Sequence, residues 1–284
     1  METLETIPAV RAAMATARAD GRRVALVPTM GFLHPGHIAL VERARAVCDV
    51  VVASIFVNPT QFAPGEDLAT YPRDADGDRR KLEAAGCDFL FQPDSNEVYP
   101  DGFSTFVSVE GVSRLFEGAI RPTHFRGVAT VVAKLFNIVR PDVAVFGQKD
   151  AQQVAVIRRM IDDLDFGIAL EIVETVREPD GLARSSRNVY LAPDDRLRAV
   201  ALSKSLEAAR GAIEDGGSLD EARARMRSTL EPSVDAIDYA EIVEAASFEP
   251  ARDGVADGLL AIVAARVGGT RLIDNAPMPA TARH

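Results

Sequence analysis

The sequence predicts an α/β protein in which a doubly wound, Rossmann-like parallel sheet precedes a smaller α+β domain. Strand-like and helix-like segments alternate along the first part of the chain. The run "VVVASIFVNP" at residues 50–59 is rich in β-branched residues, as strands buried on both faces usually are. After about residue 176 the pattern changes to helices followed by strands with a hairpin signal. We therefore expect one domain over residues 1–175 and a second over residues 176–284.

Five strand-like segments and four helix-like segments fill the expected first domain. The strands are expected at residues 24–29, 50–59, 88–93, 142–147 and 169–176, and the helices at residues 36–48, 74–86, 125–139 and 150–164. The helix at 74–86 is expected to end at Gly86, because glycine readily adopts the left-handed conformation that ends helices. Strands separated by helices pair in parallel through right-handed crossovers, which gives a doubly wound sheet.

The expected second domain begins with two helices. The first is one long helix at residues 193–216, and the second, at 218–230, opens with Ser218 and Glu221 in the spacing of a capping box. Strands should follow at 236–245 and at 258–276, the latter folded into a hairpin at Gly268–Gly269. The tail at 277–284 is expected to be loose.

Composition excludes several classes of function. A net charge of −10 over 284 residues disfavours a general nucleic-acid binder, which needs a basic surface. The N-terminus lacks a signal-peptide pattern, and no apolar run approaches the roughly 20 residues that span a bilayer. Cys48 and Cys87 form no CxxC motif and are expected to be buried thiols. We therefore expect a cytoplasmic protein with neither nucleic acid nor membrane as a partner.

Four polar segments follow predicted strands. They read "TMGFLHPGH", "NPTQF", "GQKDAQQ" and "REPDGLARSSRN", and start at residues 29, 58, 147 and 177. Ligands of open α/β sheets bind beyond the carboxyl ends of the strands, so these segments are expected to meet on one rim. Together they concentrate cations and N–H donors against the acidic charge of the whole chain. This pattern favours an anionic ligand.

The pair His34 and His37 is the strongest single motif. It spends two of the four histidines of the chain on an H-x-G-H pattern at the start of a predicted helix. Gly36 allows close backbone approach, and a helix N-terminus offers unpaired N–H groups to phosphate. Both imidazoles could donate to phosphate oxygens. The alternative is a turn in which the histidines only cap the helix.

Two further segments supply positive charge. Lys149 follows a buried strand, where a mobile ammonium suits a phosphate during transfer, although it could instead be a solvated surface lysine. Asp150 could cap the next helix or help to hold magnesium. The loop Arg184–Arg187, with Ser185 and Ser186 between guanidinium groups, resembles a polyphosphate clamp or else is an ordinary interdomain loop.

Neutral and apolar groups near the same rim suit a small polar acid. Gln61 and Gln153 could read hydroxyls and a carboxylate without neutralising charge, and Met30 and Phe62 could form an apolar wall. Arg121 could add one more positive group.

Taken together, these motifs resemble the pantothenate synthetase family. The segments "PTMGFLHPGH", "FVNPTQF", "RPTHF", "FGQKDAQQ" and "SSRNVYL" occur in this order, and the resemblance extends from about residue 20 to residue 275. HxGH alone marks the wider nucleotidyltransferase superfamily, which includes class I aminoacyl-tRNA synthetases. The resemblance implies a ligase of coenzyme A biosynthesis that condenses (R)-pantoate with β-alanine through a pantoyl adenylate, while ATP is cleaved to AMP and pyrophosphate. It also implies Mg²⁺ dependence and a homodimer.

The resemblance implies roles for particular residues. ATP would be bound by Met30, Gly31, Phe32, Leu33, His34, Pro35, Gly36, His37, Gly147, Gln148, Lys149, Asp150, Val176, Arg184, Ser185, Ser186 and Arg187. Pantoate and β-alanine would be bound by Gln61, Gln153, Asn58, Phe62 and Arg121, and catalysis would fall to His37, His34, Lys149, Ser185, Ser186 and Arg187. Gln148 and Arg184 stand where family members often have Glu and Met or Leu, and the protein ligands of magnesium stay open. The first domain would bind ATP and pantoate, and the second would cover the active site.

Three other functions share part of this pattern. A nucleotidyltransferase that adenylylates a small phosphorylated metabolite would share HxGH but would never join an amine. An aminoacyl-tRNA synthetase would need an RNA-binding surface, which the negative charge disfavours. A nucleotide sensor would not need Lys149 and the serine–arginine loop together.

Overall fold

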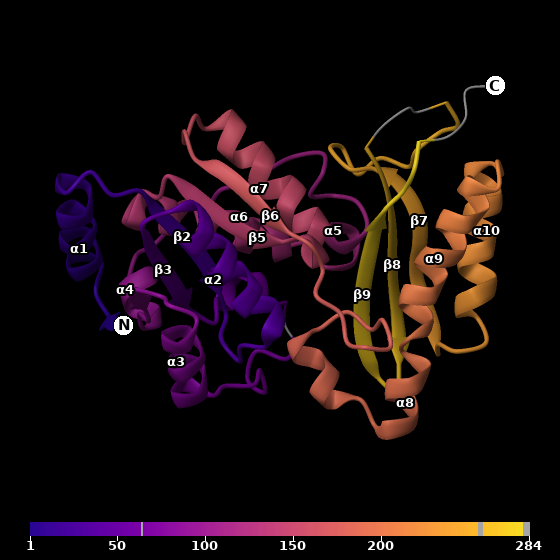
Figure 1. Ribbon diagram of the computed structural model, residues 1–284, viewed down its shortest axis with the longest axis horizontal. Helices are drawn as coiled ribbons and strands as arrows, with labels where there is room; N and C mark the ends of the chain where they lie inside the picture. The colour runs from indigo at the N-terminus through magenta and orange to yellow at the C-terminus, as the bar shows by residue number, and fades with distance from the viewer. Residues whose placement is uncertain (64, 255–257, 281–284) are drawn as a thin grey trace. The chain divides into compact units, whose positions relative to one another are not determined.

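The structure, a computed structural model, describes residues 1–63, 65–254 and 258–280. The chain divides into two compact units, one formed by Met1–Gly147 with Val156–Glu174 and the other by Gln148–Ala155 with Thr175–His284. The first carries a parallel sheet with helices and the second an antiparallel sheet with helices (Figure 1), so the predicted fold class is confirmed.

Six parallel strands form the sheet of the first unit, in the order β1-β4-β3-β2-β5-β6. Their bounds are β1 Glu2–Leu4, β2 Val24–Thr29, β3 Val50–Ile55, β4 Phe89–Phe91, β5 Val143–Gly147 and β6 Ala169–Val173. The chain winds outward from β2 to β4, returns, and restarts at β5 on the other side of β2. The switch point of the sheet therefore lies between β2 and β5, which is where doubly wound folds bind nucleotides.

Helices cover both faces of this sheet. They are α1 Ile7–Ala19, α2 Pro35–Val47, α3 Ala75–Ala84, α4 Ser95–Val98, α5 Glu117–Ile120, α6 His124–Val139 and α7 Ala151–Asp163, the last of which runs from the second unit into the first. Val41 of α2 and Leu82 of α3 pack with Ala25 and Val51 into one buried cluster. Alternate strand residues point to the opposite face, where α1 and α6 contact each other and β2.

Helices α9 and α10 and three antiparallel strands build the second unit (Figure 1). The elements are α8 Pro193–Arg198, α9 Ala201–Glu214, α10 Leu219–Leu230, β7 Ala236–Glu244, β8 Leu259–Val267 and β9 Thr270–Pro277. The predicted capping box is present, since Ser218 accepts from the Glu221 N–H and Glu221 accepts from the Ser218 N–H. The predicted hairpin is also present, and Gly268 and Gly269 have φ of +57° and +80°, as a tight turn requires.

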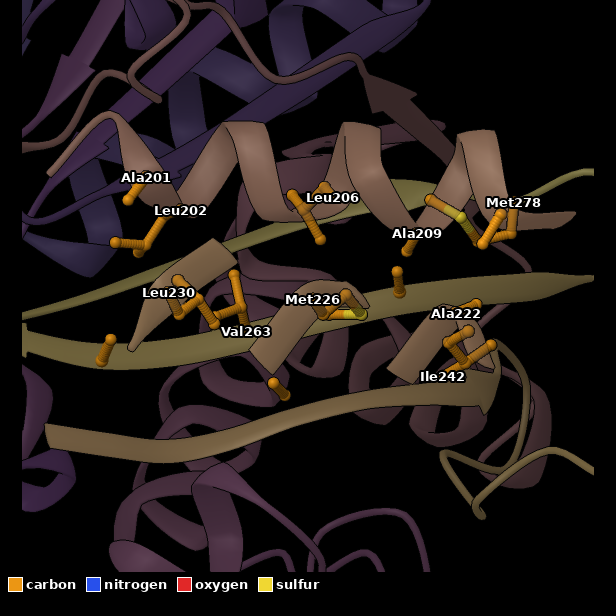
Figure 2. Packing of buried hydrophobic residues seen from close by; sticks show 14 of the residues in the cluster. Ala201, Leu202, Leu206, Ala209, Ala222, Met226, Leu230, Ile242, Val263 and Met278 are labelled. Atoms are coloured by element: carbon orange, nitrogen blue, oxygen red, sulfur yellow. The ribbon is translucent and has the colours of Figure 1, made fainter. Parts of the chain in front are cut away.

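A single apolar cluster holds this unit together. Leu206 of α9 and Met226 of α10 face Ile242 of β7 and Val263 of β8 between the helices and the sheet (Figure 2), and all four side chains are buried. Burial of side chains of this size contributes about 1.5–3 kcal/mol each. The apolar cluster therefore fixes the positions of β7, β8 and β9 and of the side chains on these strands.

Three predicted boundaries differ from the observed ones. The strand expected at 50–59 ends at Ile55, because Asn58 caps a 3-10 turn, η1, at Pro59–Gln61. The helix expected at 193–216 is two helices, since the Leu202 N–H bonds the Ala199 carbonyl three residues back and tightens the chain where Ala199 enters the core. The tail expected to be loose at 277–284 begins with residues that are fixed, because Met278 is buried and donates to Leu259, and residues 281–284 lie outside the described part.

Both cysteines are unpaired and buried, as expected. Burial raises the pKa of the Cys48 thiol and raises the pKa of the Cys87 thiol to about 11. Within the described residues, no helix combines the length and the apolar character that a membrane span requires.

Candidate active site

The two motif histidines lie against each other at the start of α2. Their ring centroids are 4.0 Å apart. His34 is the N-cap residue, and its Nδ1 accepts from the Gly36 N–H at 3.1 Å. The His34 N–H in turn donates to Nδ1 of His37 at 3.3 Å. Because both Nδ1 atoms accept backbone hydrogen bonds, the hydrogen of each neutral ring sits on Nε2.

The structure shows the capping part of the expected alternative, and a phosphate role of the histidines stays a prediction. The capping bonds are present, and they use the Nδ1 side of both rings. They hold both rings at a helix N-terminus, where the dipole favours anions. The Nε2 edges of the two rings are not used by these capping bonds.

A buried carboxylate shapes the loop between β2 and α2. Asp78 of α3 accepts from the N–H groups of Phe32 and Leu33, both at 2.7 Å, and its side chain is only 2% exposed. Phe32 has a φ of +51° and Gly31 a φ of +84°, so the loop is held in a left-handed path. Lys81 Nζ supports it by donating to the Leu33 carbonyl at 2.8 Å. Asp78 was not among the residues predicted for the site.

Replacing Asp78 with asparagine is expected to loosen this loop. One acceptor becomes an NH₂ group facing a backbone N–H, which costs about 1–3 kcal/mol of unfolding free energy. We expect kcat/KM for ATP to fall about 10-fold or more as the loop shifts. Denaturant unfolding and steady-state kinetics measure both effects. The matched control is Asp76→Asn, which changes an exposed carboxylate in the first turn of the same helix; equal effects from the two variants would contradict the assignment.

The predicted substrate residue Gln61 is held by a network of buried polar groups. Asn58 is 1% exposed, and its Nδ2 donates to Gln61 Oε1 and to the Gly127 carbonyl, both at 3.1 Å. The Asn58 Oδ1 accepts from the Tyr99 hydroxyl at 2.9 Å. Because the Gln61 oxygen is committed to Asn58, its Nε2 faces Met30 Sδ at 3.2 Å. Gln61 therefore presents its donor end beside the HxGH loop.

Gly127 lets α6 lie directly on this turn. A Cβ at that position would lie 2.4 Å from the Thr60 carbonyl oxygen. We expect Gly127→Ala to push Gln61 away, to lower stability by about 1–3 kcal/mol and to raise KM for pantoate. The control is Gly211→Ala in α9, where an added Cβ meets nothing within 4 Å and stability should rise by up to about 1 kcal/mol. An unchanged pantoate KM in a folded Gly127→Ala enzyme would contradict this role.

Arg121 and Phe62 occupy supporting positions around Gln61. The Arg121 guanidinium binds both carboxylate oxygens of Glu66, at 2.7 and 2.6 Å, and donates to the Gln61 carbonyl at 3.3 Å. Burial raises the pKa of Glu66, but the hydrogen bond and charge of Arg121 outweigh it, so that pKa is lowered. Phe62 is buried edge-on against Tyr71. Direct substrate contact by Arg121 and Phe62 stays a prediction.

Lys149 belongs to the second unit. It lies in the 3-10 turn η2, Gln148–Asp150, which follows Gly147 at the end of β5. Its Nζ is 3.8 Å from Asp150 Oδ1, and the lysine side chain is 20% exposed while that of Asp150 is 51% exposed. Gln153 lies half-buried in the first turn of α7. Asn275 of β9 bonds the backbone of this turn, and no sequence motif had pointed to it.

The serine–arginine loop is also part of the second unit. Arg184 is ion-paired with Glu178 at 3.0 Å, and its N–H donates to the Val176 carbonyl at 2.9 Å. Ser185 caps the 3-10 turn η3, Ser186–Tyr190, by accepting from the Arg187 N–H at 3.2 Å. The Arg184 guanidinium is thus partly neutralised by its own loop.

The structure brings the predicted residues together in two sets. Met30, His34, His37, Asn58 and Gln61 gather beyond the carboxyl ends of β2 and β3, within the first unit. Phe62, Arg121 and Gly147 also lie in the first unit, whereas the second unit holds Gln148–Asp150, Gln153, Val176 and Arg184–Arg187. Of the first set only Met30 lines a nearby cavity of about 290 Å³, together with Gly31, Phe32 and Asp78.

A doubly wound sheet with an HxGH helix N-terminus at its switch point defines the nucleotide-binding α/β proteins of the HxGH class. Comparison with known proteins narrows this class. Residues 2–277 match the family described as pantoate–β-alanine ligase. The chain therefore belongs to the pantoate–β-alanine ligase family, whose members join pantoate and β-alanine in an ATP-dependent reaction.

Individual relatives agree with this assignment. The pantothenate synthetase of Heliobacterium modesticaldum is 53% identical over 279 residues, which cover 97% of this chain and 98% of that protein. The crystal structure of pantothenate synthetase from Thermus thermophilus superposes with a TM-score of 0.94 at 50% identity, covering 98% of this chain and 100% of that one. The Francisella tularensis pantoate–β-alanine ligase, crystallised with β-γ ATP and β-alanine, gives a TM-score of 0.81 at 32% identity over 98% of this chain and 97% of its own.

Proposed function

We propose that this enzyme joins pantoate to β-alanine through a pantoyl adenylate. A pantoate carboxylate oxygen forms a bond to the α-phosphorus of ATP while the bond from that phosphorus to the bridging oxygen breaks, and pyrophosphate leaves. The neutral amine of β-alanine then attacks the acyl carbon, the C–O bond to AMP breaks, and the extra amine proton passes to solvent. No side-chain nucleophile is needed.

The observation that carries this proposal is the pair of imidazoles at the start of α2, held through Nδ1 by backbone N–H groups. Negative charge builds on the phosphate oxygens during attack, and preorganised donors in such a place typically contribute a few kcal/mol each. In the proposal His34, His37 and the α2 N-terminus stabilise this charge. Lys149 follows the leaving phosphates, and Ser185, Ser186 and Arg187 bind the polyphosphate. Gly147, Gln148, Val176 and Arg184 complete the nucleotide site.

Pantoate is a small acid with hydroxyl groups, and Gln61 suits it. The Gln61 donor end is fixed by Asn58, so it can bind a hydroxyl or carboxylate oxygen without a change of rotamer. Met30 and Phe62 supply the apolar side, and Gln153 contributes a second amide. Arg121 acts on this site through the Gln61 backbone.

In this proposal Mg²⁺ binds together with ATP, through the oxygens of the phosphates. Mg²⁺ prefers phosphate oxygens with one or two carboxylates, and Asp150 offers an exposed carboxylate beside Lys149. Among the described residues, no group of three or more His, Cys, Asp and Glu could hold a metal ion. When bound, the ion neutralises charge on the departing pyrophosphate.

One experiment separates this pathway from the other functions that share HxGH. Labelled pyrophosphate is followed into ATP with and without pantoate, and β-alanine is then added. We expect exchange that requires pantoate but not β-alanine, followed by formation of one amide and one AMP. Exchange in the absence of pantoate, or AMP formation without an amide product, would overturn the pathway.

The resemblance also supports three broader proposals. The enzyme works as a cytoplasmic homodimer, which sedimentation velocity at micromolar concentration tests. The first domain, residues 1–175, binds ATP and pantoate and catalyses the reaction. Residues 176–284 keep water from the acyl adenylate, because hydrolysis of such an intermediate would waste ATP.

A further inference from the structure

We propose that Asn275 of β9 is the positioning residue for Lys149. Its side chain is directed to the turn that carries the lysine. Nδ2 donates to the carbonyl oxygens of Gln148 and Lys149, both at 2.9 Å, and Oδ1 accepts from Gln148 Nε2 at 3.1 Å. Asn275 is 4% exposed, so these bonds are shielded from water. Both amide hydrogens and the amide oxygen of the Asn275 side chain are therefore hydrogen-bonded to Gln148 and Lys149.

The turn that carries Lys149 is short and contacts β9. The turn η2 has three residues and continues directly into α7. Within the described residues, the only carboxylate within 4.0 Å of the Lys149 ammonium is that of Asp150, at 3.8 Å. The backbone that Asn275 holds is therefore one determinant of where the ammonium lies.

β9 is a suitable support. Asn275 pairs with Ile262 of β8 inside the antiparallel sheet, and the apolar cluster of Figure 2 packs against that sheet. The Asn275 N–H also donates to Asp274 Oδ1 at 2.8 Å, which fixes the strand locally. A rotation of the asparagine side chain would break three bonds at once.

Asp274, the neighbour of Asn275 in β9, holds the segment that begins at Arg177. The carboxylate of Asp274 binds Arg177 at 2.6 and 3.0 Å, and Arg177 donates to the Gly181 carbonyl at 3.0 Å. Arg177 begins the segment that ends in the serine–arginine loop. Two consecutive residues of β9 thus hold the turn Gln148–Asp150 and the segment that begins at Arg177, and Asn275 holds the one with the proposed catalytic lysine.

The inference rests on the proposed action of Lys149 in adenylate formation, and a double-mutant cycle tests it. The variants are Asn275→Leu, Lys149→Met and the double variant, each assayed for pantoate-dependent pyrophosphate exchange. We expect Asn275→Leu to lower kcat about 100-fold, because a displacement of about 1 Å can have that effect. We expect KM for pantoate to stay within about twofold, and the double variant to be no slower than Lys149→Met, since both changes remove the same contribution. Thr270→Val, another buried polar residue of β9, is the control and should leave exchange unchanged.

The outcomes separate the inference from the proposed function. If Lys149→Met is slow and Asn275→Leu retains activity within about threefold, or if the two losses multiply in the double variant, Asn275 does not act through Lys149. If Lys149→Met itself is fully active, the lysine role fails and the inference fails with it. Asn275→Ser, which is smaller and cannot reach both carbonyls, repeats the cycle if the leucine variant does not fold.

Discussion

Replacing Lys149 with methionine is expected to lower pantoate-dependent pyrophosphate exchange by about 1000-fold. Methionine keeps most of the length of the side chain but removes the charge that we propose acts on the phosphates, and loss of one preorganised group in such a site typically costs about 10²–10³ in rate. The fall should appear in kcat rather than in KM for pantoate, because the proposed partner of the ammonium is the triphosphate. Stopped assays of exchange at saturating ATP measure it.

Two comparisons make this result specific. Lys149→Arg keeps a positive charge with a different shape and should recover only part of the rate. Lys204→Met removes an exposed lysine of α9 in the same unit and should change nothing. A Lys149→Met enzyme within about threefold of the wild-type rate would remove the lysine from the mechanism.

The second large effect is expected at His37. His37→Ala removes the Nε2–H donor and also the Nδ1 acceptor of the His34 N–H. We expect kcat for adenylate formation to fall about 10²–10³-fold, with a loss of stability of about 1 kcal/mol from the weakened cap. Exchange kinetics and thermal unfolding report the two effects separately.

His37→Gln distinguishes capping from catalysis. Glutamine at this position can accept from the His34 N–H as residues in a capping box do, so stability should return to the wild-type value. Its amide offers a weaker donor than a fixed imidazole, so activity should recover only in part. If restored stability brought full activity with it, the histidine would be a cap and nothing more.

Local signals predicted the fold class and several of its local features. The β-branched run at 50–59, the capping box at Ser218 and the glycine pair at 268–269 each determine their structure through neighbours in sequence. The same holds for His34 and His37, because a helix start and its cap lie within four residues. Short-range patterns of this kind can be read without knowledge of the fold.

The supporting residues could not be found in that way. Asp78 contacts a loop 45 residues earlier in the chain, and Asn275 contacts a turn 126 residues earlier. In the sequence Asp78 looks like any carboxylate of a charged helix, and Asn275 like a residue of an edge strand. β1 was also missed, because a strand of three residues shows no alternation and forms only through its pairing with β4. Contacts between residues so far apart in the sequence depend on how the whole chain folds, which local patterns do not reveal.

Oxygen transfer from pantoate to AMP tests the adenylate pathway most directly. Pantoate labelled with ¹⁸O in both carboxylate oxygens is converted with ATP and β-alanine, and the products are analysed by mass spectrometry. Attack on the α-phosphorus predicts one labelled oxygen in AMP for every amide formed, and none in pyrophosphate. Amide formation with unlabelled AMP would mean that the carboxylate never bonded to the α-phosphorus, and the mechanism built around His34, His37 and Lys149 would be wrong.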